Sequence, residues 1–471
     1  MKSIFLTLIT IVGITLSSCA QNNQGYRIEV NLTDLKDTTL LLGYHFGEKK
    51  FIADTAQIDS KGKAVFTGDS LLHGGMYIVI LPQRSYFDIL VGDDQNFSLT
   101  TSTENSLQNL NFKGSVENTA FADYQRYMNK KQEQMNELRN QMQQSQGDEN
   151  KEKEITEKIN ALDKEVKAYW DKLIDENPNT FFANIIKSLK PIEFPEFDIP
   201  EDASNADSLR WIMSYQYNQN HFFDNVDLTD SRFIRTPFFQ SRIDTYFDKI
   251  LAPIPDTIIT YSDKLIEQVK GNEDMFQYIV SHLFSKYQNS AIMGMDAVFV
   301  HLAEKYYLSG EMKGISDDLK KRITDRVADL KPNLLGQVAP NVSMRDSNNK
   351  LQELHAVNAK VTIVYFWEPG CSHCKKVTPM LRDLYKKYND KGMSVFAVYT
   401  QGEQEKWLEY IKDNELTWIN VWDPYRSTNY HKLYDIYSTP ILYILDKDKK
   451  IIAKRIGIES LERFIEQELG L

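Results

Sequence analysis

Residues 361–374, Val-Thr-Ile-Val-Tyr-Phe-Trp-Glu-Pro-Gly-Cys-Ser-His-Cys, decide the fold of the C-terminal part of this chain. The apolar, β-branched run from Val361 to Trp367 predicts a buried strand, which breaks at Pro369-Gly370. From Lys375 to Asn389, apolar residues recur at helical spacing. The sequence therefore predicts a strand, a short turn, a Cys-x-x-Cys pair and a helix in succession.

The two cysteines of this stretch have the spacing of a redox pair. We expect Cys371 at the helix N-terminus, where free N–H groups and the helix dipole lower the pKa of a thiol below about 8.5. Cys374, one turn later, is placed to resolve a mixed disulfide. Half of a zinc site has the same spacing. The chain has three cysteines in all, the third being Cys19, so redox chemistry is the favoured interpretation.

Residues 334–471 resemble a thioredoxin-fold domain of the TlpA/ResA type. The segments that carry the resemblance are Phe366-Trp367, Cys371-Ser372-His373-Cys374, Pro379 and Thr439-Pro440. The resemblance implies that Pro440 is a cis proline beside the cysteines and that Thr439 presents its main chain to an extended substrate, with Trp367 as a further substrate-binding residue. The alternative for Pro440 is an ordinary trans proline that opens a strand.

The site also departs from its relatives. Tyr365 stands where thioredoxin has a buried aspartate, and Val377 stands where ResA-like reductases have a glutamate. Either acid would help to deprotonate the resolving thiol. Glu368 is a candidate substitute, and the alternative is an exposed turn residue. His373 resembles the histidine of disulfide isomerases and of the oxidant DsbA, where an imidazole stabilises the thiolate. The alternative is a solvated histidine with little effect.

Residues 1–19 have the pattern of an export signal. A positive Lys2 precedes an apolar run that is too short to span a membrane, and Leu16-Ser17-Ser18-Cys19 resembles a bacterial lipobox. We expect a lipid on Cys19 and a protein anchored to the inner or outer membrane that faces the periplasm. A signal peptide cut at another position is the alternative.

Three domains are predicted after this signal. Alternating apolar residues and turn signals in residues 26–115 indicate an antiparallel β-sandwich, similar to the β domain that precedes thioredoxin modules in Bacteroidetes lipoproteins. Residues 117–330 show helical periodicity and resemble the accompanying helical domain of unknown function. Residues 334–471 form the α/β thioredoxin module. The fold class is therefore multidomain: β-sandwich, α-helical middle domain and thioredoxin fold.

These observations predict a thiol–disulfide oxidoreductase that acts on protein thiols and disulfides, without a metal or another cofactor. A membrane thiol donor is a possible partner. The net charge of −11, without a basic stripe, argues against nucleic acid. Two alternatives stay open. One is a Sco-like copper protein, although that family has three residues between its cysteines. The other is a non-catalytic surface-binding lipoprotein.

Overall fold

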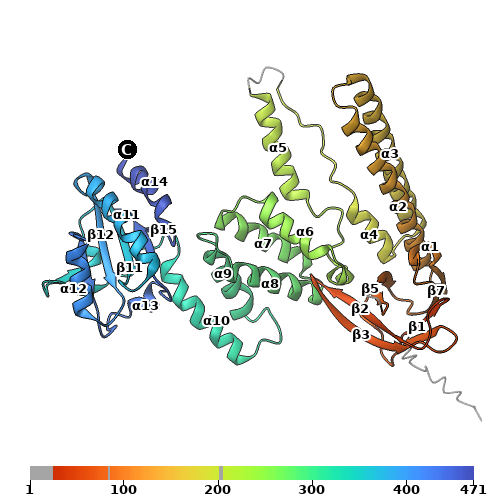
Figure 1. Cartoon of the computed structure of the whole chain (residues 1–471), viewed down its shortest axis with the longest axis horizontal. Helices are drawn as coiled ribbons and strands as arrows, with labels where there is room; N and C mark the ends of the chain where they lie inside the picture. Colours follow the sequence, from red (N-terminus) through yellow and green to blue (C-terminus); the bar gives the residue numbers. More distant parts are fainter. Residues whose placement is uncertain (1–24, 83–84, 201–204) are drawn as a thin grey trace, which may run out of the picture. The chain divides into compact units, whose positions relative to one another are not determined.

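The computed structural model describes residues 25–82, 85–200 and 205–471, which form two compact units (Figure 1). The first unit runs to Glu193 and includes Phe223–Asp227 and Ser231–Arg242. The second comprises Phe194–Phe222, Leu228–Asp230 and Ile243–Leu471. The predicted helical region is thus divided between the two units. Cys19 and the predicted signal lie outside the described residues.

The β-rich part of the first unit is a sandwich of two four-stranded sheets. One sheet has the order β4-β1-β7-β8 and the other β3-β2-β5-β6. Alternate side chains such as Val30 and Leu42 point between the sheets into one apolar core. The strands are β1 (Arg27–Leu32), β2 (Thr39–Phe46), β3 (Lys49–Gln57), β4 (Lys63–Thr67), β5 (Gly75–Ile80), β6 (Tyr86–Val91), β7 (Asn96–Thr101) and β8 (Asn111–Lys113).

The sequence pattern predicted a wholly antiparallel sandwich, but one pair of neighbouring strands is parallel. Strand β1 pairs with β7 in parallel, with Ile28 opposite Phe97. An alternating pattern defines which face of a strand is buried but not the direction of its neighbour, because the side-chain period is the same in both kinds of sheet.

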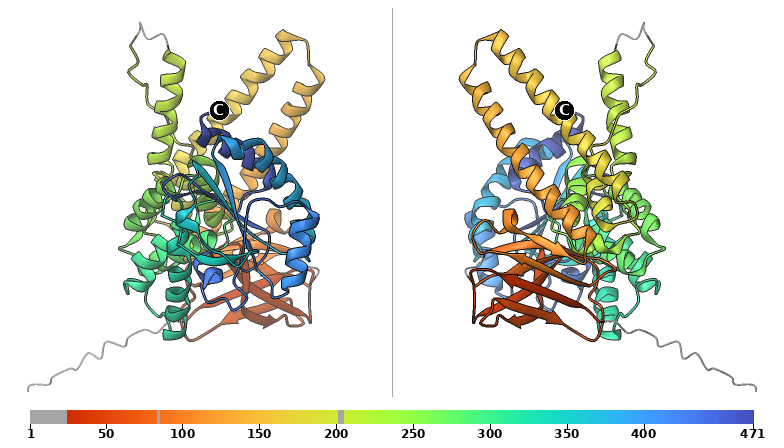
Figure 2. Two further views of the ribbon diagram at one scale, coloured as in Figure 1. Left: turned by 90° about the vertical axis from the view of Figure 1, so that its left-hand side faces the viewer. Right: turned by 90° about the vertical axis from the view of Figure 1, so that its right-hand side faces the viewer.

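The two longest helices of the first unit form an antiparallel hairpin, which Figure 2 shows in orange and yellow. Helices α2 (Val116–Gln144) and α3 (Glu149–Glu176) form it, with Tyr127 packed on Tyr169 at a centroid distance of 3.9 Å. Ser115 and Asp148 cap the two N-termini through their side chains. The other helices of this unit are α1 (Ser106–Asn109) and α4 (Phe181–Leu189), and α6 (Phe239–Thr245) continues into the second unit.

The second unit contains a helical part and the predicted thioredoxin module. Its helical part buries side chains such as Ile266, Val280 and Leu283. The α-helices of this part are α5 (Ala206–His221), α7 (Pro255–Val269), α8 (Glu273–Gln288), α9 (Asp296–Leu302) and α10 (Asp317–Leu330). Among the described residues, we find no helix with the length and apolar character needed to cross a bilayer.

The C-terminal module is a seven-stranded sheet with the order β10-β9-β13-β12-β11-β14-β15. Strands β11, β12 and β13 run parallel, and β14 is antiparallel to β11. The strands are β9 (Ser343–Asp346), β10 (Leu351–Glu353), β11 (Val361–Trp367), β12 (Met393–Tyr399), β13 (Ile419–Trp422), β14 (Ile441–Leu445) and β15 (Ile451–Lys454). The helices are α11 (Ser372–Tyr388), α12 (Gln404–Asp413), α13 (Tyr430–Leu433) and α14 (Ile458–Leu469).

Strand β11 is central, and all seven of its residues are buried. Its odd-numbered residues face one apolar core and its even-numbered residues from Val364 face another. Burial on both faces explains the unbroken apolar run of this strand, since a strand with one solvated face would alternate. Figure 1 shows α11 directly after it.

Candidate active site

Cys371 is the N-cap of helix α11, as the sequence predicts. Its main chain is extended, and its Sγ accepts a hydrogen bond from the Cys374 amide at 3.2 Å. A sulfur at the N-cap accepts a hydrogen bond from one of the first amide N–H groups, which have no acceptor inside the helix. Both cysteines are free thiols, with Cys371 partly exposed and Cys374 fully buried. Of the two, Cys371 is the one that a substrate can reach.

The surroundings of the two thiols move their pKa values in opposite directions. Burial disfavours the Cys371 thiolate, but hydrogen bonds from Cys374, the Thr439 side chain and the His373 amide outweigh burial and lower the pKa. For Cys374, burial is the largest cause, followed by the hydrogen bond with Cys371, and together they raise the pKa to about 12. The pair therefore combines one thiol that ionises readily with one that stays protonated.

The Thr439–Pro440 segment lies beside Cys371, and its peptide bond is cis, which confirms the prediction. The thiol of Cys371 donates to the carbonyl oxygen of Thr439 at 3.3 Å. The Thr439 hydroxyl donates to a carboxylate oxygen of Glu368 at 3.0 Å. Strand β14 is paired antiparallel to β11, with Ile441 opposite Phe366, so the start of one strand meets the end of the other.

The buried thiol of Cys374 lies beside hydroxyl groups. Tyr365 is fully buried, shares a hydrogen bond with Thr378 at 2.9 Å, and interacts with the side chain of Cys374. Burial is the main reason that the pKa of Tyr365 lies far above its usual range, so this hydroxyl stays neutral. Tyr410 also interacts with Thr378. Sequence reasoning missed Thr378, whose only signal is a polar residue on the apolar face of α11.

Two residues of the predicted site, Trp367 and His373, have side chains in positions that do not match the roles expected for them. Trp367 is fully buried, with its ring 5.0 Å from that of Tyr410, so its side chain lies under the site and does not reach the surface where a substrate would bind. His373 is exposed in the first turn of α11. Its main-chain amide is the part of the residue that acts on Cys371 in this structure.

Within the part of the chain that the structure describes, no three histidine, cysteine, aspartate or glutamate side chains gather as metal ligands would.

Comparisons with known proteins match each part of the chain separately. A family described as thioredoxin-like matches residues 358–451. Two families described as domains of unknown function, DUF4369 and DUF5106, match residues 26–121 and 138–333.

Several known proteins are similar to the C-terminal module or to a larger part of the chain. The thiol-disulfide oxidoreductase ResA of Bacillus cereus is 28% identical over 136 residues, which are 29% of this chain and 78% of ResA. A domain of a possible thiol-disulfide isomerase from Cytophaga hutchinsonii is 44% identical, with a TM-score of 0.28, and the match covers 29% of this chain and 93% of that domain. A thioredoxin-like protein from Bacteroides caccae is 21% identical, with a TM-score of 0.46, over 59% of this chain and 99% of its own.

The family match, the ResA relatives and the arrangement of strands around the cysteines agree with one another. The chain is therefore a multidomain protein with a C-terminal thioredoxin-like domain that is similar to ResA, and it is a redox enzyme of the thiol-disulfide oxidoreductase class.

Proposed function

We propose that this enzyme exchanges disulfides with protein substrates through Cys371 and Cys374. The observation that carries the proposal is the position of Cys371 Sγ, which lies at the N-cap of α11 within hydrogen-bond reach of the Cys374 amide and the Thr439 carbonyl. One partly exposed thiol of lowered pKa beside a buried thiol of raised pKa is the arrangement that two-step exchange requires.

In the reducing direction, the Cys371 thiolate attacks one sulfur of the substrate disulfide. A mixed disulfide forms and the other substrate sulfur leaves as a thiolate, which takes up a proton. Cys374 then loses its proton and attacks Cys371 Sγ, which forms the Cys371–Cys374 disulfide and releases the second substrate thiol. Two electrons pass from the enzyme to the substrate. The same steps in reverse oxidise a dithiol.

The Thr439 main chain is the proposed contact for the substrate. It lies next to Cys371, two residues before strand β14 and directly before the cis Pro440, where an extended chain could pair with it. Glu368 fixes this segment by accepting the hydrogen bond from the Thr439 side chain. An extended segment of a protein that contains the reacting cysteine is the class of substrate that suits such a contact.

The cellular setting belongs to the same proposal. The sequence around Cys19 supports a lipid anchor, with the domains on the periplasmic side of the inner or outer membrane. Metabolic labelling with a radioactive fatty acid tests the anchor. Label in the full chain that is lost in Cys19→Ser is expected, and equal label in both would contradict it.

Exchange itself is tested with single-cysteine variants. We expect Cys371→Ser to lose exchange with protein disulfides, and Cys374→Ser to accumulate mixed disulfides that reducing agents release. The double variant Cys371→Ser/Cys374→Ser is the control for substrate that is retained without a mixed disulfide. Unchanged exchange by Cys371→Ser would overturn the proposal.

A further inference from the structure

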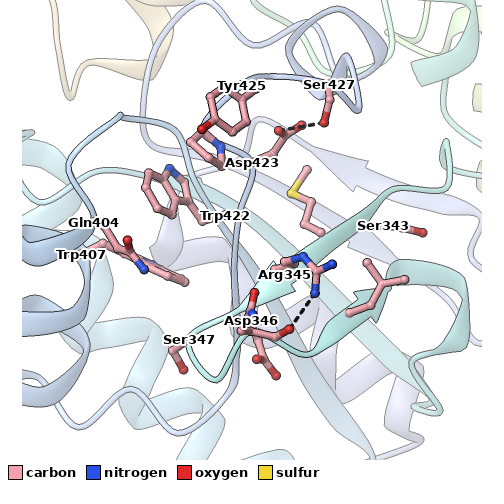
Figure 3. A pocket seen from close by; sticks show the side chains of 14 residues that line it. Ser343, Arg345, Asp346, Ser347, Gln404, Trp407, Trp422, Asp423, Tyr425 and Ser427 are labelled. Atoms are coloured by element: carbon pink, nitrogen blue, oxygen red, sulfur yellow. Dashed lines mark hydrogen bonds between the residues drawn. The ribbon is translucent and has the colours of Figure 1, made fainter.

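A pocket of about 410 Å³ opens in the thioredoxin-like domain, away from the two cysteines (Figure 3). Its volume falls within the range of about 300–1,000 Å³ that is common for ligand sites. Residues of β9, α12 and β13 and of the loop after β13 line it. None of the steps proposed above uses these residues.

The pocket and the redox site share one edge of the sheet. Strands β11, β12 and β13 are parallel neighbours, and their last residues pair in register, Trp367 with Tyr399 and Tyr399 with Trp422. Neighbouring strands lie about 4.8 Å apart, so Trp422 in the pocket is about 10 Å from Trp367, which is followed by the Cys371 turn. An extended chain covers about 10 Å in three residues.

Aromatic side chains dominate one side of the pocket. Trp407 and Trp422 pack at a centroid distance of 5.7 Å, and Figure 3 shows them together with Gln404. Tyr425 extends the aromatic surface outward and is 89% exposed. The indole N–H of Trp407 is buried and has no acceptor among the described residues.

A positive side chain faces the aromatic ones. Figure 3 shows Arg345 of β9 across the pocket from Trp422. One guanidinium N–H of Arg345 donates to the carbonyl oxygen of Asn349 at 2.9 Å. The remaining donors suit an oxygen atom of a ligand, and the planar group itself stacks on aromatic faces.

The loop that carries Tyr425 is held in place by hydrogen bonds. The carboxylate of Asp423 accepts from the Thr428 amide at 2.7 Å, from the Thr428 hydroxyl at 2.8 Å and from Ser427 at 3.0 Å. These bonds order the loop before a ligand arrives, which reduces the entropy lost on binding.

We infer that this pocket is a specificity subsite that receives an aromatic side chain of the substrate protein, a few residues from the reacting cysteine. The inference rests on the proposed function, since the substrate chain must cross the sheet edge from Cys371. Tyrosine is the side chain that suits the pocket best, because its ring packs on Trp422 and Tyr425 while its hydroxyl pairs with Arg345.

The test compares short peptides with one cysteine, each linked to an identical copy through a disulfide. One series carries tyrosine at a single position between three and six residues before or after the cysteine, and the matched series carries alanine there. The reduced full chain takes up each disulfide in a single turnover. We expect a rate constant about tenfold higher for one tyrosine position than for its alanine match.

Variants of the pocket then test which residues cause the preference for tyrosine peptides. We expect Tyr425→Ala and Arg345→Ala each to remove most of it while the rate with the alanine peptide stays unchanged. Tyr86→Ala removes a half-exposed aromatic ring of the β-sandwich and serves as the control. Equal rates for tyrosine and alanine peptides would overturn the subsite, as would a tyrosine preference that survives both variants. Failure of every peptide to react would instead contradict the proposed function.

Discussion

The hydroxyl of Thr439 donates a hydrogen bond to the carboxylate of Glu368 across 3.0 Å, and this bond joins the two loops of the redox site. Glu368 follows strand β11, while Thr439 precedes the cis proline before β14. The carbonyl oxygen of the same Thr439 accepts from the thiol of Cys371. Glu368 is therefore a positioning residue that acts on Cys371 through Thr439.

Replacement of Glu368 by alanine is expected to slow exchange with peptide disulfides about fivefold, because one hydrogen bond is worth about 1 kcal/mol. Glu368→Gln keeps an acceptor oxygen and should recover most of the rate, a rescue that a change in charge alone would not give. Asp383→Asn removes an exposed carboxylate of α11 and is the control. Equal loss in the glutamine and alanine variants would contradict the positioning role.

The opposite pKa shifts of the two thiols predict selective alkylation. A thiol reacts as its thiolate, so labelling rises as the pH rises through the pKa. Cys371, with a lowered pKa, should reach half of its maximal rate at a lower pH than an ordinary thiol. Cys374, with a pKa of about 12, should stay unlabelled between pH 6 and 10. Pulse labelling with iodoacetamide and peptide mapping measure both in one sample, and similar profiles for the two cysteines would contradict the assignment.

Short-range sequence patterns were sufficient to predict the position of Cys371, but they were insufficient to predict which residues surround it. The order strand, turn, Cys-x-x-Cys and helix placed Cys371 at the N-cap, because these elements are adjacent in sequence. The bond from Thr439 to Glu368 joins residues 71 positions apart and depends on the antiparallel pairing of β14 with β11. Sequence alone left Glu368 open between a site residue and a turn residue.

The buried strand predicted for Val361 to Trp367 already implied a buried Trp367, whereas its substrate-binding role came from the family resemblance alone. Trp367 is two residues after Tyr365 on the same strand, so both rings face one core. The pocket was beyond sequence reasoning. Strands β9 and β10 have four and three residues, which are too few to show a period. Without them, one wall of the pocket could not be predicted.

His373 tests whether an exposed imidazole still tunes the pair. If its positive form stabilises the Cys371 thiolate, His373→Ala raises the pKa of Cys371 and makes the disulfide harder to reduce. A tenfold change in the equilibrium with glutathione corresponds to about 30 mV, towards a lower reduction potential. Lys386→Ala, which removes a positive charge at the far end of the same helix, is the control. An unchanged equilibrium would show that the His373 side chain does not tune the pair and that only its main-chain amide acts on Cys371.

Tyr365→Phe tests the hydroxyl pair beneath the resolving cysteine. The change removes one partner of the buried Thr378 hydroxyl, which also interacts with Tyr410, and the loss of one hydrogen bond costs about 1 kcal/mol. Because a multidomain chain does not unfold in one step, the free energy of local opening is measured by hydrogen exchange of the α11 amides. We expect faster exchange in Tyr365→Phe and no change in Tyr425→Phe, whose hydroxyl is at the surface.

The double variant Tyr365→Phe/Thr378→Val separates this hydrogen bond from simple packing. Valine has nearly the shape of threonine but has no hydroxyl, so neither hydroxyl of the pair is left without the other, while Tyr410 loses its contact with Thr378. The protection of α11 should therefore return part of the way to that of the unchanged chain, because removal of both partners of a hydrogen bond is close to neutral. If the two substitutions instead add their separate losses, the hydroxyls do not act as a pair, and Tyr365 supports Cys374 through its ring alone.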